Sequence, residues 1–167
     1  MGSGKSTVSP VLAQILGWNH LDMDLEIERR TGLSVAEIFR QRGEQAFRGE
    51  ELTLARELMA RERLVVAAGG GAFAQSDTRE ALRRDAAAVW LRCDLETVMA
   101  RIPRDGSRPL AGSRETIAAL FAARELSYRL ADWTFDAARH PPEALAREIA
   151  DAVFPDRERP ARRMREP

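Results

Sequence analysis

The N-terminal residues of the chain have the types and the spacing needed to bind nucleotide phosphates. The segment Gly2-Ser3-Gly4-Lys5-Ser6-Thr7 matches the second half of the phosphate-binding loop pattern G-x-x-x-x-G-K-[ST]. Glycines let successive backbone N–H groups turn toward phosphate oxygens, and the positive end of the following helix adds to the attraction. In such a loop the lysine reaches the β- and γ-phosphates, and the next hydroxyl ligates Mg²⁺. Taken alone, the segment also fits a chance Gly- and Ser-rich terminus.

The identity of the lysine supports the phosphate-binding interpretation. Of the 26 basic residues in the chain, Lys5 is the only lysine and all the others are arginine. A single lysine placed at random among the basic positions would fall here with odds of one in 26. Position 5 therefore requires a compact ammonium on a flexible stem, which a planar guanidinium does not imitate.

Two carboxylates, Asp22 and Asp24, directly follow a short apolar run. One carboxylate of such a pair can hold Mg²⁺, usually through water. The other can orient a substrate hydroxyl and accept its proton during phosphoryl transfer. The pair by itself also fits the acidic N-terminus of a helix, but its position after the loop favours the catalytic interpretation.

Two other segments offer groups for an anionic substrate. In Gly43–Arg48 the glycine ends one helix and Glu44 begins the next, so that Arg48 can present a fork to a carboxylate. Gly69-Gly70-Gly71 follows the apolar run of residues 64–68, where a backbone that approaches a ligand closely would require glycine. The alternative for Arg48 is an ordinary surface arginine, and the alternative for the triple glycine is a plain turn.

Further basic residues lie in the second half of the chain. Arg101 and Arg124 flank a segment rich in Gly, Pro, Ser and Arg, and Arg108 lies within that segment. This composition predicts a mobile lid at about residues 103–115 that carries cations toward a transferring phosphoryl group.

The elements that must position these groups are short apolar strands alternating with helices. Residues 18–21, 64–68, 87–91 and 133–135 read as buried strands, and the longer segments between them have helical spacing. Such alternation predicts an α/β fold with a parallel sheet and right-handed crossovers, whose ligands bind beyond the carboxyl ends of the strands.

Composition limits the class of protein. A length of 167 residues fits one domain, placed at 1–155, and the charged, proline-containing segment 156–167 is expected to be a disordered tail. Zero formal net charge argues against a nucleic-acid or membrane binder. The single cysteine, Cys93, excludes an internal disulfide and favours a reducing cytoplasm.

The ordered set of motifs resembles the shikimate kinase family. The resemblance runs from Gly2 to about Val153 and rests on the loop, D-x-D, G-E-x-x-F-R, G-G-G, R-P-L and R-x-x-x-Y. It implies a P-loop kinase three-layer sandwich with sheet order 2-3-1-4-5. It also implies a monomeric enzyme that uses ATP and Mg²⁺ to phosphorylate the 3-hydroxyl of shikimate, in aromatic amino-acid biosynthesis.

The resemblance also assigns roles to residues. Catalysis falls to Lys5, Asp24 and Arg108. The ATP site comprises Gly2, Ser3, Gly4, Lys5, Ser6, Thr7, Arg101, Arg108, Arg139 and Pro142. Shikimate is bound by Asp24, Arg48, Gly69, Gly70, Gly71 and Arg124. The metal is associated with Ser6 and Asp22.

Two departures and two alternatives accompany the resemblance. The family pattern R-x-P-L-Y is replaced by Arg124-Glu125-Leu126-Ser127-Tyr128, and the adenine loop reads Ala138-Arg139-His140-Pro141-Pro142. One alternative is another P-loop small-molecule kinase, such as a gluconate-type enzyme, which would not need two arginines for a carboxylate. The other is a non-catalytic ligand-sensing module, which would not need a proton acceptor and a lid arginine.

By the resemblance, the sheet's first strand and the first glycine of the loop should come before Met1. That strand would be the central one of the sheet. We therefore expect an open slot between residues 64–68 and 87–91, with Gly2–Ser6 poorly anchored. We also expect a protein of residues 1–167 alone to be unfolded or aggregated, because inner sheet edges would lack their partner.

Overall fold

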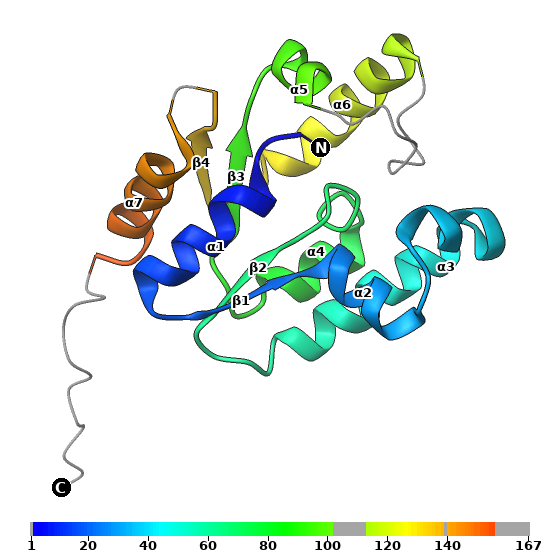
Figure 1. Ribbon diagram of the computed structural model, residues 1–167, viewed down its shortest axis with the longest axis horizontal. Coiled ribbons are helices and arrows are strands. Elements are labelled where there is room, and N and C mark those ends of the chain that lie inside the picture. Colours follow the sequence, from blue (N-terminus) through cyan, green and yellow to red (C-terminus); the bar gives the residue numbers. More distant parts are fainter. Residues whose placement is uncertain (1, 102–112, 139, 156–167) are drawn as a thin grey trace, which may run out of the picture.

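The computed structural model describes residues 2–101, 113–138 and 140–155, in which helices alternate with short strands (Figure 1). In chain order the elements are α1 (Lys5–Leu16), β1 (Asn19–Asp22), α2 (Met23–Thr31), α3 (Val35–Leu58), β2 (Leu64–Ala67), α4 (Ser76–Arg83), β3 (Val89–Arg92), α5 (Leu95–Arg101), α6 (Arg114–Tyr128), β4 (Trp133–Asp136) and α7 (Pro142–Val153).

The strands form two separate parallel pairs. β1 pairs with β2, with Asn19 opposite Leu64, and β3 pairs with β4, with Val89 opposite Trp133. In the described part of the chain no strand pairs with the facing edges of β2 and β3. The predicted order, with a position open at the centre of the sheet, is therefore confirmed. The predicted strand bounds differ from the observed ones by at most two residues.

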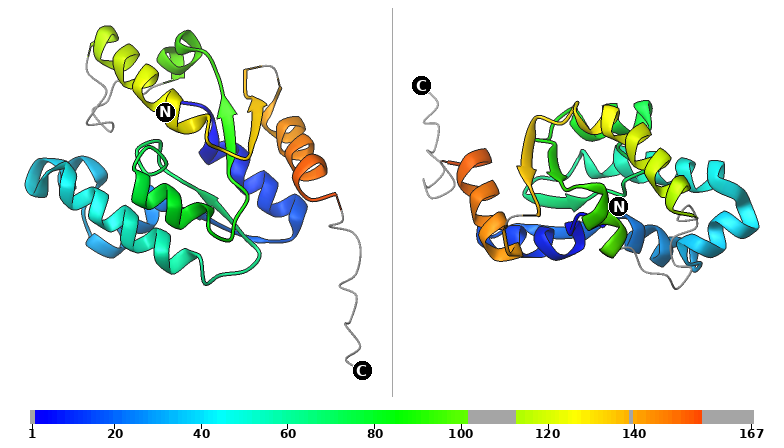
Figure 2. Two further views of the ribbon diagram at one scale, coloured as in Figure 1. Left: turned by 180° about the vertical axis from the view of Figure 1, so that it is seen from behind. Right: turned by 90° about the horizontal axis from the view of Figure 1, so that it is seen from above.

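Helices cover both faces of the strands, as expected for a buried parallel sheet. On one face α1 and α7 pack together over Val65, Leu91 and Phe135 (Figure 2). On the other face α2, α3 and α4 pack over β1 and β2, where Leu64 and Val66 join the core. Neighbouring residues of β2 thus point to opposite layers, which is the period of a strand.

Local signals set the boundaries of α3. Ser34 and Glu37 form a reciprocal capping box at its N-terminus. Gly43, with φ 82° and ψ 167°, breaks the helical path, so that a new helical segment begins at Glu44. The predicted helix break is confirmed, and the segment after it carries Arg48, whose guanidinium lies against Gly71 beyond the end of β2.

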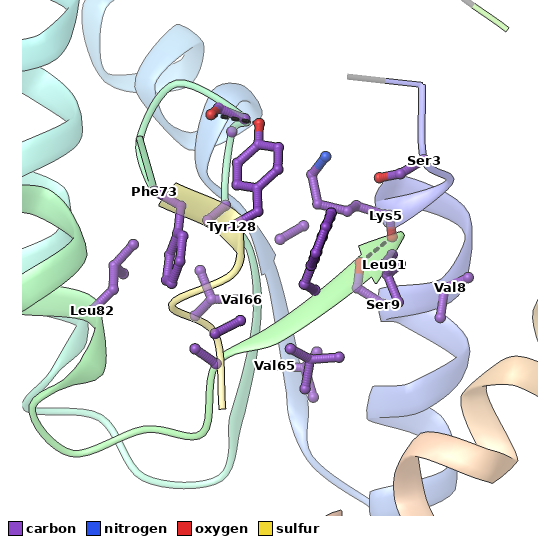
Figure 3. Close-up of a pocket in the computed structure, with 18 of the residues that line it drawn as sticks. Ser3, Lys5, Val8, Ser9, Val65, Val66, Phe73, Leu82, Leu91 and Tyr128 are labelled. Carbon is purple, nitrogen blue, oxygen red and sulfur yellow. Dashed lines mark hydrogen bonds between the residues drawn. The ribbon is translucent and has the colours of Figure 1, made fainter. Parts of the chain in front are cut away.

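A cavity of about 240 Å³ occupies the space between the two strand pairs. Its walls include residues 64–68 on the β2 side and 88–91 on the β3 side, and Ser3 and Lys5 lie at one end (Figure 3). We call this cavity the inter-strand groove. It confirms the expected slot.

The expectation that Gly2–Ser6 is poorly anchored is wrong. The Ser6 hydroxyl donates a hydrogen bond to Asp22, and the Ser9 hydroxyl donates to the Lys5 carbonyl at 2.7 Å. A Cβ built on Gly2 would lie 3.0 Å from the Val98 carbonyl oxygen, so the loop also packs against α5. Contacts from three elements hold the loop although no described strand leads into it.

Candidate active site

The residues of the predicted phosphate-binding loop form the start of α1. Gly4, with φ 86°, is the N-cap, and its carbonyl accepts hydrogen bonds from the N–H groups of Thr7 and Val8. A positive φ at this position favours glycine. Lys5 is the first helical residue and lies at the end of the inter-strand groove (Figure 3). The N-terminal end of α1 therefore carries a lysine where an anion would be attracted.

Asp22 connects the loop to the end of β1. Its Oδ2 accepts a hydrogen bond of 3.0 Å from Ser6 Oγ, and its Oδ1 accepts one of 3.0 Å from the Asp24 N–H. Asp22 is thus the N-cap of α2, and it places a carboxylate beside the hydroxyl of the loop. The sequence predicted this neighbourhood from two motifs in different elements, and the structure brings them together.

Arg48 lies on α3 within a network of charged and aromatic groups. Its guanidinium donates to Glu44 Oε1 and to Glu51 Oε2, in each case at 2.6 Å. The Arg48 Cζ also lies 5.8 Å from the ring centroid of Phe39 and 5.6 Å from that of Phe47. Two carboxylates and two rings fix the plane of the guanidinium before any ligand is present.

Glu51 is a functional candidate that the sequence interpretation missed. The residue is only 1% exposed, and its Oε1 has no hydrogen-bond partner among the described residues. Burial raises the pKa of the Glu51 carboxyl, the charge of Asp24 adds to this effect, and Arg48 and Arg124 act against it. The i,i+3 spacing from Arg48 was the available signal, but such pairs are common on solvent-exposed helix faces.

The triple glycine is the surface on which these side chains converge. A Cβ at Gly71 would overlap the Arg48 guanidinium. A Cβ at Gly69 would lie 2.9 Å from Asp24 Oδ1 and 3.0 Å from Glu51 Oε1. Glycine is therefore required here by the site's own side chains, which brings Asp24, Glu51 and Arg48 to one place after β2.

Tyr128 and Arg124 of α6 lie next to the triple glycine, at the inter-strand groove. The Tyr128 hydroxyl donates to a backbone carbonyl, that of Gly70, at 2.8 Å (Figure 3). The Tyr128 ring also packs on Trp90 of β3, with the ring centroids 5.9 Å apart. Burial raises the pKa of the Tyr128 hydroxyl, while the adjacent Arg124 lowers it. Arg124 is only 8% exposed and lies at the groove with Tyr128, so it faces the site.

The sequence departure before Tyr128 places one side chain outward and one against the segment after β2. Leu126 is 70% exposed, and the Ser127 hydroxyl makes a long hydrogen bond of 3.5 Å to the Ala74 carbonyl. The altered residues leave Arg124 and Tyr128 in place, because these two lie four residues apart on one helical face.

The remaining predicted residues belong to other elements. Arg101 ends α5, and its Cβ lies 3.5 Å from the position of a Cβ at Gly2, so it is beside the loop. Pro142 is the first residue of α7. Arg108 and Arg139 lie outside the described residues, as do residues 102–112 of the predicted lid and the tail from 156. Of the predicted lid only residues 113–115 are described, where Ser113 caps α6 and Arg114 begins it, and the lid stays a prediction.

The oxygen atoms near the loop suit a cation that is held mainly by a bound phosphate and water. Among the described residues, no three His, Cys, Asp or Glu side chains form a group that could hold a metal ion. Mg²⁺ bound to nucleotides needs only one or two protein oxygens, and Ser6 Oγ and Asp22 Oδ2 supply two at 3.0 Å from each other.

No helix in the described ranges is long and apolar enough to cross a membrane.

Comparisons with known proteins agree on one family. The family model described as shikimate kinase matches residues 1–154. A shikimate kinase of Moorella thermoacetica is 42% identical over 155 residues, which cover 92% of this chain and 90% of the relative. A shikimate kinase of Methylococcus capsulatus is 37% identical and is covered over 87% of its length, with 91% of this chain aligned.

Solved structures give the same result at the level of the fold. Shikimate kinase from Acinetobacter baumannii in complex with shikimate matches with a TM-score of 0.88 and 36% identity, covering 93% of this chain and 89% of that one. Shikimate kinase from Aquifex aeolicus matches with a TM-score of 0.83 and 31% identity, covering 92% and 91% respectively.

Proposed function

The chain belongs to the shikimate kinase family, whose reaction is the ATP-dependent phosphorylation of shikimate, and we propose that the side chains gathered after β1 and β2 carry out that reaction. The proposed acceptor is the 3-hydroxyl of shikimate. Its oxygen attacks the γ-phosphorus of ATP, the bond from that phosphorus to the β,γ-bridging oxygen breaks, and ADP leaves. Such transfer depends mainly on positioning and on neutralising charge.

The ATP phosphates are assigned to the N-terminal end of α1. Lys5 supplies the mobile positive charge for the β- and γ-phosphates, and the loop Gly2, Ser3, Gly4 and the residues Ser6 and Thr7 supply backbone N–H groups. Ser6 and Asp22 would hold Mg²⁺, which supplies charge neutralisation when bound. Arg101 beside Gly2 is assigned to the nucleotide base side. Arg108, Arg139 and Pro142 keep the ATP-binding roles that the resemblance implies.

The shikimate carboxylate is assigned to Arg48 and Arg124. Both guanidinium groups are largely buried, and Arg48 is held by Glu44 and Glu51 at 2.6 Å. Charge-assisted hydrogen bonds from a pre-oriented guanidinium are strong and directional. Glu51 acts here as a positioning residue, because it holds Arg48 against Gly71 and touches the site only through that contact and its approach to Asp24.

Asp24 is assigned to the reacting hydroxyl. It faces Gly69, one residue from the glycine whose carbonyl binds Tyr128. A carboxylate there can orient the 3-hydroxyl and accept its proton as the oxygen attacks. Asp22, two residues earlier, accepts a hydrogen bond from Ser6 and caps the N-terminus of α2. The two carboxylates therefore have separate roles.

The convergence of Asp24, Arg48 and Arg124 near the triple glycine is the observation that carries this proposal. A gluconate-type kinase would not need two buried arginines for a carboxylate, and a ligand sensor would not need a proton acceptor such as Asp24. Shikimate-dependent ADP formation in a coupled assay, compared with ATP and shikimate binding by calorimetry, separates catalysis from sensing. Binding of both ligands without ADP formation would favour the sensor.

Variants of the two aspartates test the division of roles. Asp24→Asn should lower kcat strongly and leave the Mg²⁺ requirement unchanged, because it removes the proton acceptor. Asp22→Asn should raise the Mg²⁺ concentration needed for half-maximal rate. A raised Mg²⁺ requirement in the Asp24 variant alone would reverse the assignment.

We further propose that the protein works as a monomer in the cytoplasm with shikimate and ATP as its partners. The support is the neutral net charge and the single buried cysteine, which suits a reducing compartment. Sedimentation at increasing protein concentration would reveal any self-association.

A further inference from the structure

Two residues of β1 hold the first turns of α1, and one of them has no role in the site described above. Asp22 accepts a hydrogen bond from the Ser6 hydroxyl. His20 lies two residues earlier, and its Nε2 is 2.8 Å from the Ser9 hydroxyl oxygen. Alternate residues of a strand face the same side, so both side chains meet α1, while Leu21 between them joins the opposite core layer. β1 therefore contacts the start of α1 at two points.

The Ser9 hydroxyl connects His20 to the backbone of Lys5. It donates its single hydrogen to the Lys5 carbonyl oxygen at 2.7 Å (Figure 3). A hydroxyl has one hydrogen and two lone pairs, so the contact with His20 requires the imidazole to donate. The hydrogen bonds therefore run from His20 Nε2–H to Ser9 and from Ser9 to Lys5. The His20 ring is exposed, but Ser9 is only 7% exposed, so water has little access to the centre of this relay.

The helix itself gives this turn little support. Pro10 lies inside α1, where it supplies no N–H to the carbonyl of Ser6, and its ring crowds that carbonyl. The N-cap of α1 is Gly4, which has no side chain to bind the free N–H groups of the first turn. The weakened turn is the one that carries Lys5 and Ser6. Hydrogen bonds from the side chains of β1 therefore supply support that α1 lacks.

We propose that Ser9 and His20 are positioning residues for the phosphate-binding loop. They fix the backbone of Lys5, so that its ammonium is held in one place relative to the β- and γ-phosphates. Neither side chain touches the reacting atoms, and both act through Lys5. The identity of the phosphates as those of ATP rests on the proposed function, whereas the hydrogen bonds do not.

The test uses three variants of the pair and one matched control. His20→Phe keeps a flat ring but removes the donor, and His20→Gln restores an N–H donor. Ser9→Ala removes both hydrogen bonds. The control is Thr31→Val, because the Thr31 hydroxyl donates to the carbonyl four residues earlier, that of Ile27, at 2.8 Å, at the end of α2 distant from Asp22. ATP affinity is measured by calorimetry without shikimate, alongside thermal unfolding.

His20→Phe should weaken ATP binding by about 3- to 10-fold, the range expected for one hydrogen bond, and His20→Gln should stay within about twofold of the parent. Ser9→Ala should weaken binding at least as much as His20→Phe. Adding His20→Phe to Ser9→Ala should cause no further loss, because the partner is already gone. Thr31→Val should lower the unfolding temperature and leave ATP affinity unchanged. Parental ATP affinity in His20→Phe and Ser9→Ala, or additive losses in the double variant, would overturn the proposal.

A second measurement leaves the pair itself intact. The chain has two histidines, His20 and His140, so the imidazole signals in a nitrogen NMR spectrum can be assigned by comparison with His140→Gln. Neutral His20 should carry its hydrogen on Nε2. A neutral His20 with its hydrogen on Nδ1 would refute the relay, even if the substituted proteins did not fold.

Shikimate-dependent ADP formation by the parent protein keeps this proposal separate from the proposed function. Turnover by the parent, combined with variants that bind ATP as the parent does, would reject the positioning role alone. ATP binding that depends on Ser9 and His20, in a parent that does not turn over shikimate, would support the positioning role and reject the proposed function.

Discussion

At the scale of residues, the site depends on side chains that hold one another in place. Arg48 lies between Glu44 and Glu51, and the absence of side chains at Gly69 and Gly71 lets Arg48, Asp24 and Glu51 approach. Organisation of this kind reduces the cost of fixing a guanidinium when a ligand binds. It also means that one substitution can affect stability and binding together.

Replacing Lys5 by arginine should lower kcat by more than ~10-fold, which is a barrier change of about 1.4 kcal/mol. The charge is kept, but a guanidinium is broader and cannot take the place of a compact ammonium between loop and phosphates. Steady-state kinetics with saturating shikimate measure the effect. Arg61→Lys, in the exposed turn after α3, is the matched control and should leave kcat unchanged. A Lys5→Arg variant within tenfold of the parent would contradict the assigned role.

Replacing Arg48 by alanine should weaken both shikimate binding and folding. It leaves the Glu51 carboxylate buried without its partner, which typically costs about 3–5 kcal/mol. The double variant Arg48→Ala with Glu51→Gln should recover much of the stability and none of the shikimate affinity, while ATP affinity stays near that of the parent. Urea unfolding and calorimetry separate the two effects. Recovery of shikimate binding in the double variant would show that Arg48 does not contact the substrate.

At the scale of elements, the helices that carry Asp24 and Arg48 are joined by an ion-pair network. Glu26 of α2 accepts hydrogen bonds of 2.8 Å from Arg29 and Arg30, and Arg30 also pairs with Glu57 of α3 at 2.7 Å. These contacts connect the two elements whose side chains Asp24 and Arg48 approach the Gly69–Gly71 segment. The α2–α3 pair therefore sets the distance between the proposed base and the proposed carboxylate ligand.

Glu26→Gln should reduce the free energy of unfolding at neutral pH. Hydrogen bonds from Arg29 and Arg30 lower the pKa of Glu26 from its ordinary 4.5 to about 2. The folded state therefore binds fewer protons, so this contribution is complete above pH 4.5 and is lost as the pH falls toward 2. Urea midpoints of parent and variant should converge across that window. A difference in urea midpoint that stays constant across this pH window would contradict the assignment. Glu62→Gln, in the turn before β2, is the control.

At the scale of the whole molecule, contacts between layers hold the two strand pairs together. α1 packs against β1 and β2 on one side and α7 on the other, and thereby bridges the pairs. At the opposite end from the loop, Arg83 of α4 binds Asp132 at 2.6 Å, and the Asp132 carboxylate accepts the Ala88 N–H at 2.8 Å. The inter-strand groove lies between these two connections.

Asp132→Ala should lower the free energy of unfolding and loosen the β3–β4 pair relative to β1–β2. The Ala88 N–H, and then Arg83, lower the pKa of Asp132 below its ordinary 3.8. Its contribution is therefore present above pH 3.8 and decreases as the pH falls below that value. Urea unfolding at several pH values measures this, with Asp85→Ala as an exposed control. A variant difference that grew toward acid pH would contradict the proposed connection.

The sequence by itself determined the class of fold and predicted the residues of the site. Lys5, Asp22, Asp24, Arg48 and Gly69–Gly71 were identified from local patterns, because loops, caps and strand ends have residue requirements that act over a few positions. The parallel pairing followed from the alternation of apolar runs and helical segments. The break at Gly43 was likewise a local feature, fixed by a positive φ.

Only the tertiary structure decided how distant residues act on one another. In the sequence, Arg48 and Glu51 form an ordinary i,i+3 pair. The pair is buried because α3 packs against β2 and the glycines, and no local sequence pattern predicts that packing. The packing of the loop against Val98 was not foreseen for the same reason. Buried charged and polar side chains must pair with one another, because leaving a charge or polar atom unpaired away from water costs free energy.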